Sequence, residues 1–139
     1  MSGIREVFPV EAGGFTTAGE ASATIKQILK KLGVDAGVVR RVAVASYEVE
    51  LNLIIHSLGG ELLLHVDDHR VRITSQDRGP GIPDIDLAMR EGYSTASEDA
   101  RSLGFGAGMG LPNMKRNADQ FAITSDPGVG TCIQMDFNI

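Results

Sequence analysis

The sequence predicts an α+β fold, specifically a two-layer α/β sandwich in which helices cover one face of a mixed, mostly antiparallel sheet. Long amphipathic helical patterns dominate the first half of the chain, and short β-rich runs joined by turns come in pairs later. Strands that follow one another across a short turn pair antiparallel, and an amphipathic helix needs a sheet or another helix to cover its apolar side.

Length and composition set the class of protein before any motif is considered. The chain has 139 residues, 42% hydrophobic and 22% charged, which suits one compact domain over residues 1–139. Its formal net charge of -5 gives no electrostatic reason to expect direct binding to nucleic acid. Cys132 is the only cysteine, and no apolar run approaches the roughly 20 residues of a membrane span, so we expect a cytoplasmic protein without disulfides or membrane contact.

The first two elements are a strand and a helix. Residues 4–10 mix β-branched and polar side chains and predict a strand that ends near Pro9 and a glycine pair. Residues 16–32 carry apolar side chains at helical spacing, with Gly33 as the expected stop. The apolar positions of this helix are Ala21, Ile25, Ile28, Leu29 and Leu32.

A second helix is expected from Asp35, which suits an N-cap, to about residue 57. The 3.6-residue period continues through Val38, Val42, Ala45, Val49 and Leu53.

The rest of the chain predicts paired strands around one irregular stretch. Residues 61–66 and 70–75 are β-rich and flank the polar segment 67–69, as in a hairpin. Residues 79–110 are rich in Gly, Pro, Ser and charged side chains, with a possible short helix at 84–90, and a long irregular stretch inside a small domain is usually functional. A helix at 111–118 and strands at 121–125 and 131–137 complete the fold.

Glu48, Asn52 and His56 form the first candidate site pattern. They are spaced by four residues on the second predicted helix, so all three share one face. A solvated polar stripe is the alternative reading, because charged positions on amphipathic helices usually face water.

Three glycine-containing motifs follow. Asp77-Arg78-Gly79-Pro80-Gly81 comes at the end of a predicted strand, and Gly128-Val129-Gly130-Thr131 enters the last one; each also suits an ordinary turn. Between them, glycines at every second position lead directly into a helix, where backbone N–H groups and the helix N-terminus favour phosphate; a flexible loop is the alternative. These glycines are Gly104, Gly106, Gly108 and Gly110.

Taken in this order, the four motifs resemble the N, G1, G2 and G3 boxes of the Bergerat-fold superfamily of ATP-binding domains. The resemblance extends from about Val38 to the C-terminus. Within the superfamily, segments 77–88, 91–95 and 108–116 look like the branch of bacterial anti-sigma factors and switch protein-serine kinases.

The resemblance implies roles for the helix residues. Asn52 would coordinate the Mg²⁺ that bridges the ATP phosphates, and Glu48 would be the base or positioning carboxylate for the attacking hydroxyl. His56 would lie near the same phosphates. An amide oxygen suits a hard cation, and phosphoryl transfer depends mainly on alignment and charge neutralisation.

It also implies where the rest of ATP binds. Asp77 would accept a hydrogen bond from the adenine amino group, Gly79 and Gly81 would let the backbone pass close to the base, and Thr131 would support adenine recognition. The glycines from Gly104 to Gly110, with Leu111 at the start of the following helix, would contact ATP within a mobile lid over about residues 82–110.

We therefore expect a regulatory protein-serine kinase that uses Mg²⁺ and ATP and acts on a small regulatory protein or a sigma factor, and we consider a homodimer as its assembly. The alternative is an ATP-gated binding module that sequesters its partner without transferring phosphate, and a slow ATPase without a protein acceptor ranks third. A sensor histidine kinase or a gyrase-type ATPase is expected less, because we see no dimerising hairpin before Val38 and no transducing domain.

Overall fold

The computed structural model describes residues 3–55, 59–79, 85, 89, 110–126 and 128–139 of the chain. In chain order, the elements are β1 (Ile4–Val10), the 3₁₀ turn η1 (Phe15–Thr17), α1 (Glu20–Lys31), α2 (Ala36–Ile55), β2 (Gly60–Val66), β3 (Arg70–Asp77), α5 (Gly110–Asn117), β4 (Gln120–Asp126) and β5 (Gly130–Asn138). The five strands form one sheet in the order β1-β2-β3-β5-β4, and all four neighbouring pairs are antiparallel. The predicted α+β sandwich is confirmed, but the sheet was expected to be mixed, whereas every strand pair among the described residues is antiparallel.

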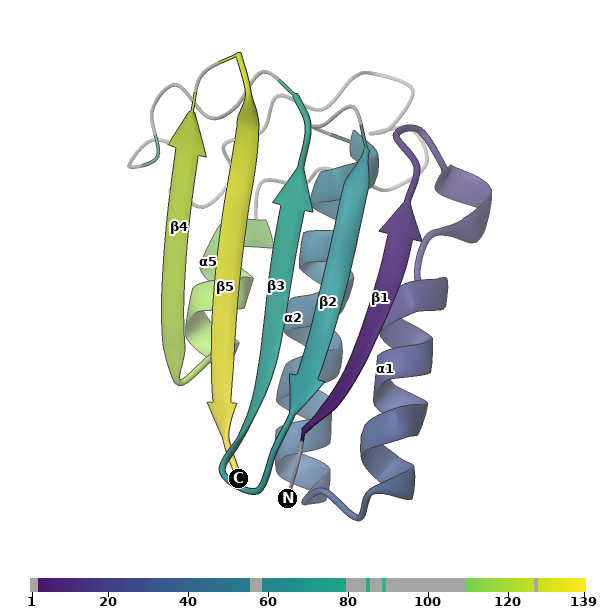
Figure 1. Cartoon of the computed structure of the whole chain (residues 1–139), viewed down its shortest axis with the longest axis vertical. Helices are drawn as coiled ribbons and strands as arrows, with labels where there is room; N and C mark the ends of the chain where they lie inside the picture. Colours follow the sequence, from purple (N-terminus) through teal and green to yellow (C-terminus); the bar gives the residue numbers. More distant parts are fainter. Residues whose placement is uncertain (1–2, 56–58, 80–84, 86–88, 90–109, 127) are drawn as a thin grey trace.

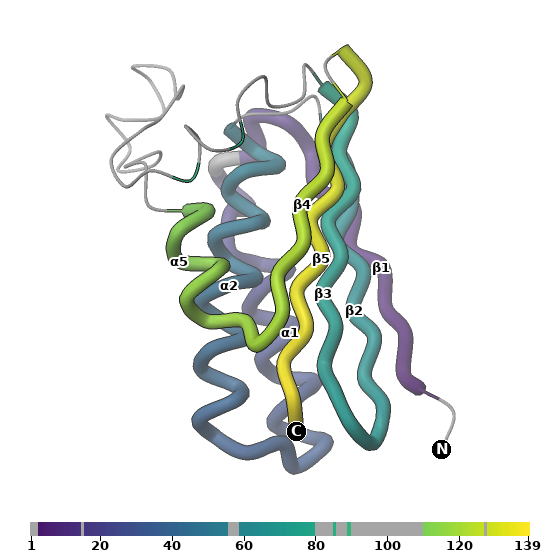
Figure 2. The backbone as a smooth tube through the Cα atoms, turned by 90° about the vertical axis from the view of Figure 1, so that its left-hand side faces the viewer, coloured from purple at the N-terminus to yellow at the C-terminus, as the bar shows by residue number. Residues whose placement is uncertain are grey.

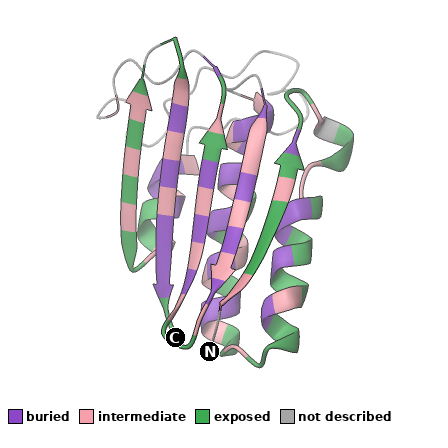
Figure 3. Cartoon of the chain, viewed as in Figure 1, coloured by how far each residue is buried: buried purple, intermediate pink, exposed green. Residues whose placement is uncertain are grey.

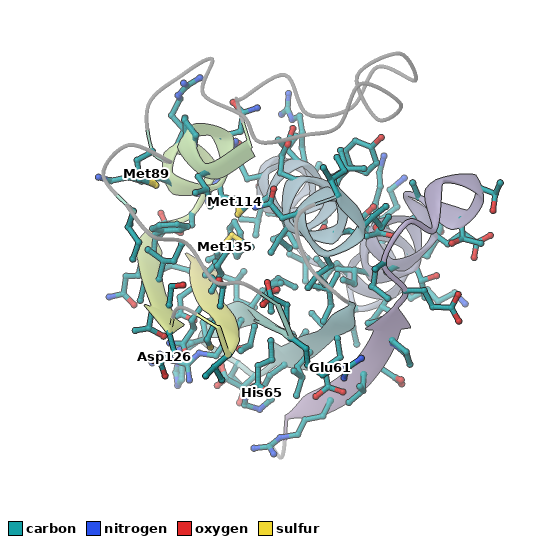
Figure 4. All side chains as sticks on the ribbon, turned by 90° about the horizontal axis from the view of Figure 1, so that it is seen from above. Glu61, His65, Met89, Met114, Asp126 and Met135 are labelled. Atoms are coloured by element: carbon teal, nitrogen blue, oxygen red, sulfur yellow. The ribbon has the colours of Figure 1, made fainter. Side chains whose placement is uncertain are left out.

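The molecule has two layers, with α1, α2 and α5 on one face of the sheet (Figures 1 and 2). Buried residues alternate along the three central strands, whereas the edge strands β1 and β4 are mostly exposed or half-buried (Figure 3). In Figure 4, Met114 of α5 and Met135 of β5 lie together between the two layers, while Glu61 and His65 project from the opposite face of β2. The core therefore lies between the sheet and the helices.

Helix α1 begins later than the sequence predicts. The predicted segment 16–32 divides into η1 and α1, because Gly19 between them adopts the left-handed conformation (φ 95°). At the other end, Gly33 (φ 76°) ends the helix as expected, and Val34 N–H donates to the Leu29 carbonyl at 3.1 Å.

The N-terminus of α1 is held by a carboxylate from α2. Glu50 is only 2% exposed and accepts hydrogen bonds from three backbone N–H groups, of Gly19 (3.0 Å), Ala21 (3.3 Å) and Ser22 (3.0 Å). These are N–H groups that a helix start leaves without intrahelical partners, and a negative charge is favourable there. The buried charge thus fixes α1 against α2.

The other predicted elements are present with small shifts at their ends. Asp35 caps α2 as expected, because its carboxylate accepts the Gly37 N–H at 3.0 Å. Strand β3 continues two residues beyond its predicted end at Ser75 and thereby includes Asp77. For the predicted short helix at 84–90, the Met89 N–H donates to the Ile85 carbonyl at 2.9 Å. Of the helices that the structure describes, none has both the length and the apolar character needed to cross a bilayer.

Candidate functional site

Helix α2 presents two polar side chains beside the first residue of α5. The face of α2 toward the sheet is fully buried at Val42, Val49 and Leu53, so the half-buried Glu48 and Asn52 lie on a different side of the helix. Their surroundings are therefore set by the neighbouring helix.

Gly110, where α5 begins, lies against both of these side chains. A Cβ atom at position 110 would be 3.3 Å from Glu48 Oε2 and 3.4 Å from Asn52 Oδ1. The two oxygens therefore converge on one point at the N-terminus of α5, where helix geometry favours negative charge. They are oxygen donors of the kind that a hard cation such as Mg²⁺ prefers.

Asp77 and Thr131 form the second part of the site. Asp77 Oδ1 accepts the Thr131 backbone N–H at 2.7 Å, and a Cβ on Gly130 would overlap the Asp77 carbonyl oxygen. Only glycine at position 130 allows this close approach. Burial raises the pKa of the Asp77 carboxyl, and the hydrogen bond from Thr131 partly offsets that effect.

Two further contacts join the turns around Asp77. The buried Gly79 donates its N–H to the Val129 carbonyl at 3.1 Å, which ties the turn after β3 to the turn between β4 and β5. Thr131, only 8% exposed, lies with its hydroxyl 3.3 Å from the Ser125 hydroxyl. A pocket of about 320 Å³ opens at this end of the sheet and includes Asp77, Ser125 and Thr131 in its lining.

The two parts lie toward the same end of the molecule. Figure 1 shows the C-terminal ends of α2 and β3 and the beginning of β5 at that end, with the beginning of α5 directed toward it. The structure therefore brings Glu48, Asn52 and Gly110 together, and it brings Asp77, Gly79 and Thr131 together.

The remaining predicted residues divide into two groups. Leu111 is 7% exposed and belongs to the hydrophobic core under α5, so its contact with ATP stays a prediction. The others lie outside the described residues, as does most of the predicted lid at 82–110. These are His56, Gly81, Gly104, Gly106 and Gly108.

Sequence reasoning missed two residues at the site. Asn113, one helical turn after Gly110, points its side-chain amide nitrogen at Glu48 Oε1, 3.4 Å away. Ser125 pairs with the hydroxyl of Thr131 across β4 and β5, where the two residues are register partners. Helical spacing from Gly110 and strand register from Thr131 are the signals that could have found them.

The comparisons with known proteins agree with this geometry. Residues 37–139 match the family described as histidine kinase-, DNA gyrase B-, and HSP90-like ATPase. The chain is 33% identical over 113 residues to the serine/threonine-protein kinase RsbT of Bacillus subtilis (strain 168), covering 78% of this chain and 79% of that protein. It is 31% identical over 121 residues to an anti-sigma F factor of Bacillus licheniformis, covering 83% and 80% of the two chains. The family match takes in both parts of the site, and this chain belongs to the histidine kinase-, DNA gyrase B- and HSP90-like ATPases.

Proposed function

We propose that this chain is a regulatory protein kinase that transfers the γ-phosphate of ATP to a serine of a small partner protein. The observation that carries the proposal is the convergence of Glu48 Oε2 and Asn52 Oδ1 beside the start of α5. A relative named a serine/threonine-protein kinase, 33% identical over 113 residues, supports phosphate transfer over simple binding.

ATP would bind with its base at one part of the site and its phosphates at the other. The adenine amino group would donate to the Asp77 carboxylate oxygen that Thr131 does not occupy. Gly79 and Gly81 would pass close to the base. The glycines between Gly104 and Gly110, together with His56 and Leu111, would surround the phosphates.

Each residue on α2 has one task in this scheme. Mg²⁺, when bound, neutralises phosphate charge, and Asn52 Oδ1 would hold it. Glu48 takes the proton of the serine hydroxyl while the serine oxygen forms a bond to the γ-phosphorus. The bond from that phosphorus to the bridging oxygen breaks, and ADP leaves.

The partner would be a small regulatory protein or a sigma factor. The names of the two relatives, a serine/threonine-protein kinase and an anti-sigma F factor, support a partner of this kind. The competing function is an ATP-gated binding module, in which ATP controls capture of the partner and no phosphoprotein forms.

The Glu48→Gln variant separates these two functions. We expect it to lower phosphate transfer about 10²–10⁴-fold, because a positioned general base contributes about that much, while ATP affinity stays nearly unchanged. The assay incubates the purified chain with γ-labelled Mg-ATP and an extract of the source organism, and measures phosphoserine in the labelled proteins. Transfer by Glu48→Gln at the rate of the unaltered chain would remove the base assignment.

A matched control distinguishes loss of the base from a general effect of changing Glu to Gln. Glu61→Gln makes the same change on the face of the sheet opposite the helices and should leave both transfer and ATP affinity intact (Figure 4). A chain that binds ATP and captures a protein, yet labels none, would establish the binding module instead.

A further inference from the structure

The Glu48 carboxylate lies beside the first turn of α5. Its Oε2 is 3.3 Å from the place where a Cβ added to Gly110 would be, and its Oε1 lies 3.4 Å from the amide nitrogen of Asn113, one turn later. The second contact is at the long end of hydrogen bonding, and such contacts in catalytic sites are often long until the substrate is bound. Of the two oxygens, Oε1 thus has a hydrogen-bond donor outside α2.

We propose that Asn113 is a positioning residue, which holds Glu48 Oε1 so that Oε2 stays directed at the acceptor hydroxyl beside Asn52. The proposal rests on the kinase function and names the group that orients its base. A neutral amide suits this task, because it donates a hydrogen bond without placing another charge beside the base.

Arg116 favours this orientation of the Asn113 amide. Its Oδ1 lies 3.5 Å from Arg116 Nη1, so the donor end of the amide is the end that faces Glu48. The Asn117 side chain bonds the Asn113 carbonyl at 2.8 Å. The side chain of Asn113 therefore has a defined partner on each side.

The backbone of α5 is held against α2 independently of Asn113. Arg41 of α2 donates to the Asn117 carbonyl at 3.1 Å and to Asp119 Oδ1 at 3.3 Å, at the end of α5 away from the site. Met114, fully buried, anchors the middle of the helix in the core. Loss of the Asn113 amide should consequently leave α5 in place.

The test compares Asn113→Ala with Asn113→Asp. If Asn113 positions Glu48 by donating a hydrogen bond, alanine should lower kcat about tenfold, the equivalent of one hydrogen bond. Aspartate should lower kcat further, because it has the same shape but no N–H to donate, and its negative charge repels Oε1 from its position. The KM for ATP should change little in either variant, and Lys115→Ala, an exposed change on the same helix, should have no effect.

A role in packing alone predicts the opposite order. Aspartate would then behave like asparagine, because the two have the same shape, and alanine would be the slower variant. That order, or unchanged kcat in both variants, would overturn the proposal. The acceptor for these rates is the protein labelled by the unaltered chain in the extract experiment.

A second measurement does not depend on turnover. In ¹⁵N-labelled protein without nucleotide, the side-chain amide signals of Asn113 should move on Glu48→Gln and stay in place on Glu61→Gln. Side-chain amide signals that do not shift in Glu48→Gln would contradict the contact between Asn113 and Glu48. If the signals move but the unaltered chain transfers no phosphate, both the kinase function and the positioning role of Asn113 are wrong. If transfer is normal and only the order of the Asn113 variants differs from the expected one, the positioning role alone is wrong.

Discussion

The carboxylates at the two ends of the sheet differ in their hydrogen bonds and ion pairs. At the end away from the site, the buried Asp136 accepts two hydrogen bonds from the Arg72 guanidinium, at 2.7 and 3.1 Å. Asp119 accepts the Asn138 backbone N–H at 2.7 Å and forms an ion pair with Arg41 at 3.3 Å. At the site end, Asp77 accepts one backbone hydrogen bond, from Thr131, and within the described residues it forms no ion pair.

The pKa directions follow this difference. The Asn138 N–H and then Arg41 hold the pKa of Asp119 below its ordinary value, whereas burial raises the pKa of Asp77. A partly buried carboxylate that lacks a positive partner lowers the stability of the fold. Such a residue is a candidate binding site, because a ligand can supply the missing hydrogen-bond donor or positive charge. The comparison separates the paired carboxylates Asp119 and Asp136 from Asp77, whose role in binding adenine is our proposal.

The largest effect expected from this comparison is on nucleotide affinity. Asp77→Asn keeps an oxygen for the Thr131 N–H but places an amide donor where the adenine amino group would donate. An unpaired buried donor costs about 1–3 kcal/mol, so ATP affinity should fall roughly 5- to 150-fold, measured by calorimetric titration. Equal affinity in the variant would mean that adenine binds elsewhere.

Asp136→Asn is the matched control at the other end. It replaces a carboxylate that is buried and paired with Arg72, so it should lower the free energy of unfolding in urea while ATP affinity stays the same. A loss of ATP affinity in this variant would show that the two ends are not functionally distinct.

The smallest effects concern pH, and the two ends should show opposite signs. Because the pKa of Asp77 is raised in the folded state, its contribution to stability is full below its ordinary value and is lost as pH rises through the folded value. Because the pKa of Asp119 is lowered, its contribution is present above its ordinary value and is lost as pH falls through the folded value.

Urea unfolding between about pH 3 and pH 7 tests these signs. Relative to the unaltered chain, Asp77→Asn should gain stability as pH rises, and Asp119→Asn should lose it. Parallel pH profiles for the two variants would contradict the contrast between the two ends.

Local sequence patterns predicted much of this molecule. The apolar period that places Val42, Val49 and Leu53 on one side of α2 also places Glu48 and Asn52 off that side, and the Asp35 cap and the Gly33 stop follow from the same local rules. Such features depend on residues within one or two helical turns, which a single sequence displays directly.

What the sequence did not predict depends on contacts between distant segments. Glu50 looks like an ordinary helix charge, yet it holds N–H groups about 30 positions earlier in the chain, at Gly19, Ala21 and Ser22. Asn113 meets Glu48 only because α5 packs against α2. Spacing along the chain contains no information on such pairs until the helices are placed side by side.

The central claim, that α2 and the turn motifs together bind one Mg²⁺-chelated ATP, is tested most directly by calorimetric titration of the whole chain with Mg-ATP. We expect one ATP site per chain. We also expect ATP to stabilise the fold against unfolding by about 2.7 kcal/mol when free ligand is 100 times Kd. Absence of both binding heat and thermal protection would contradict it.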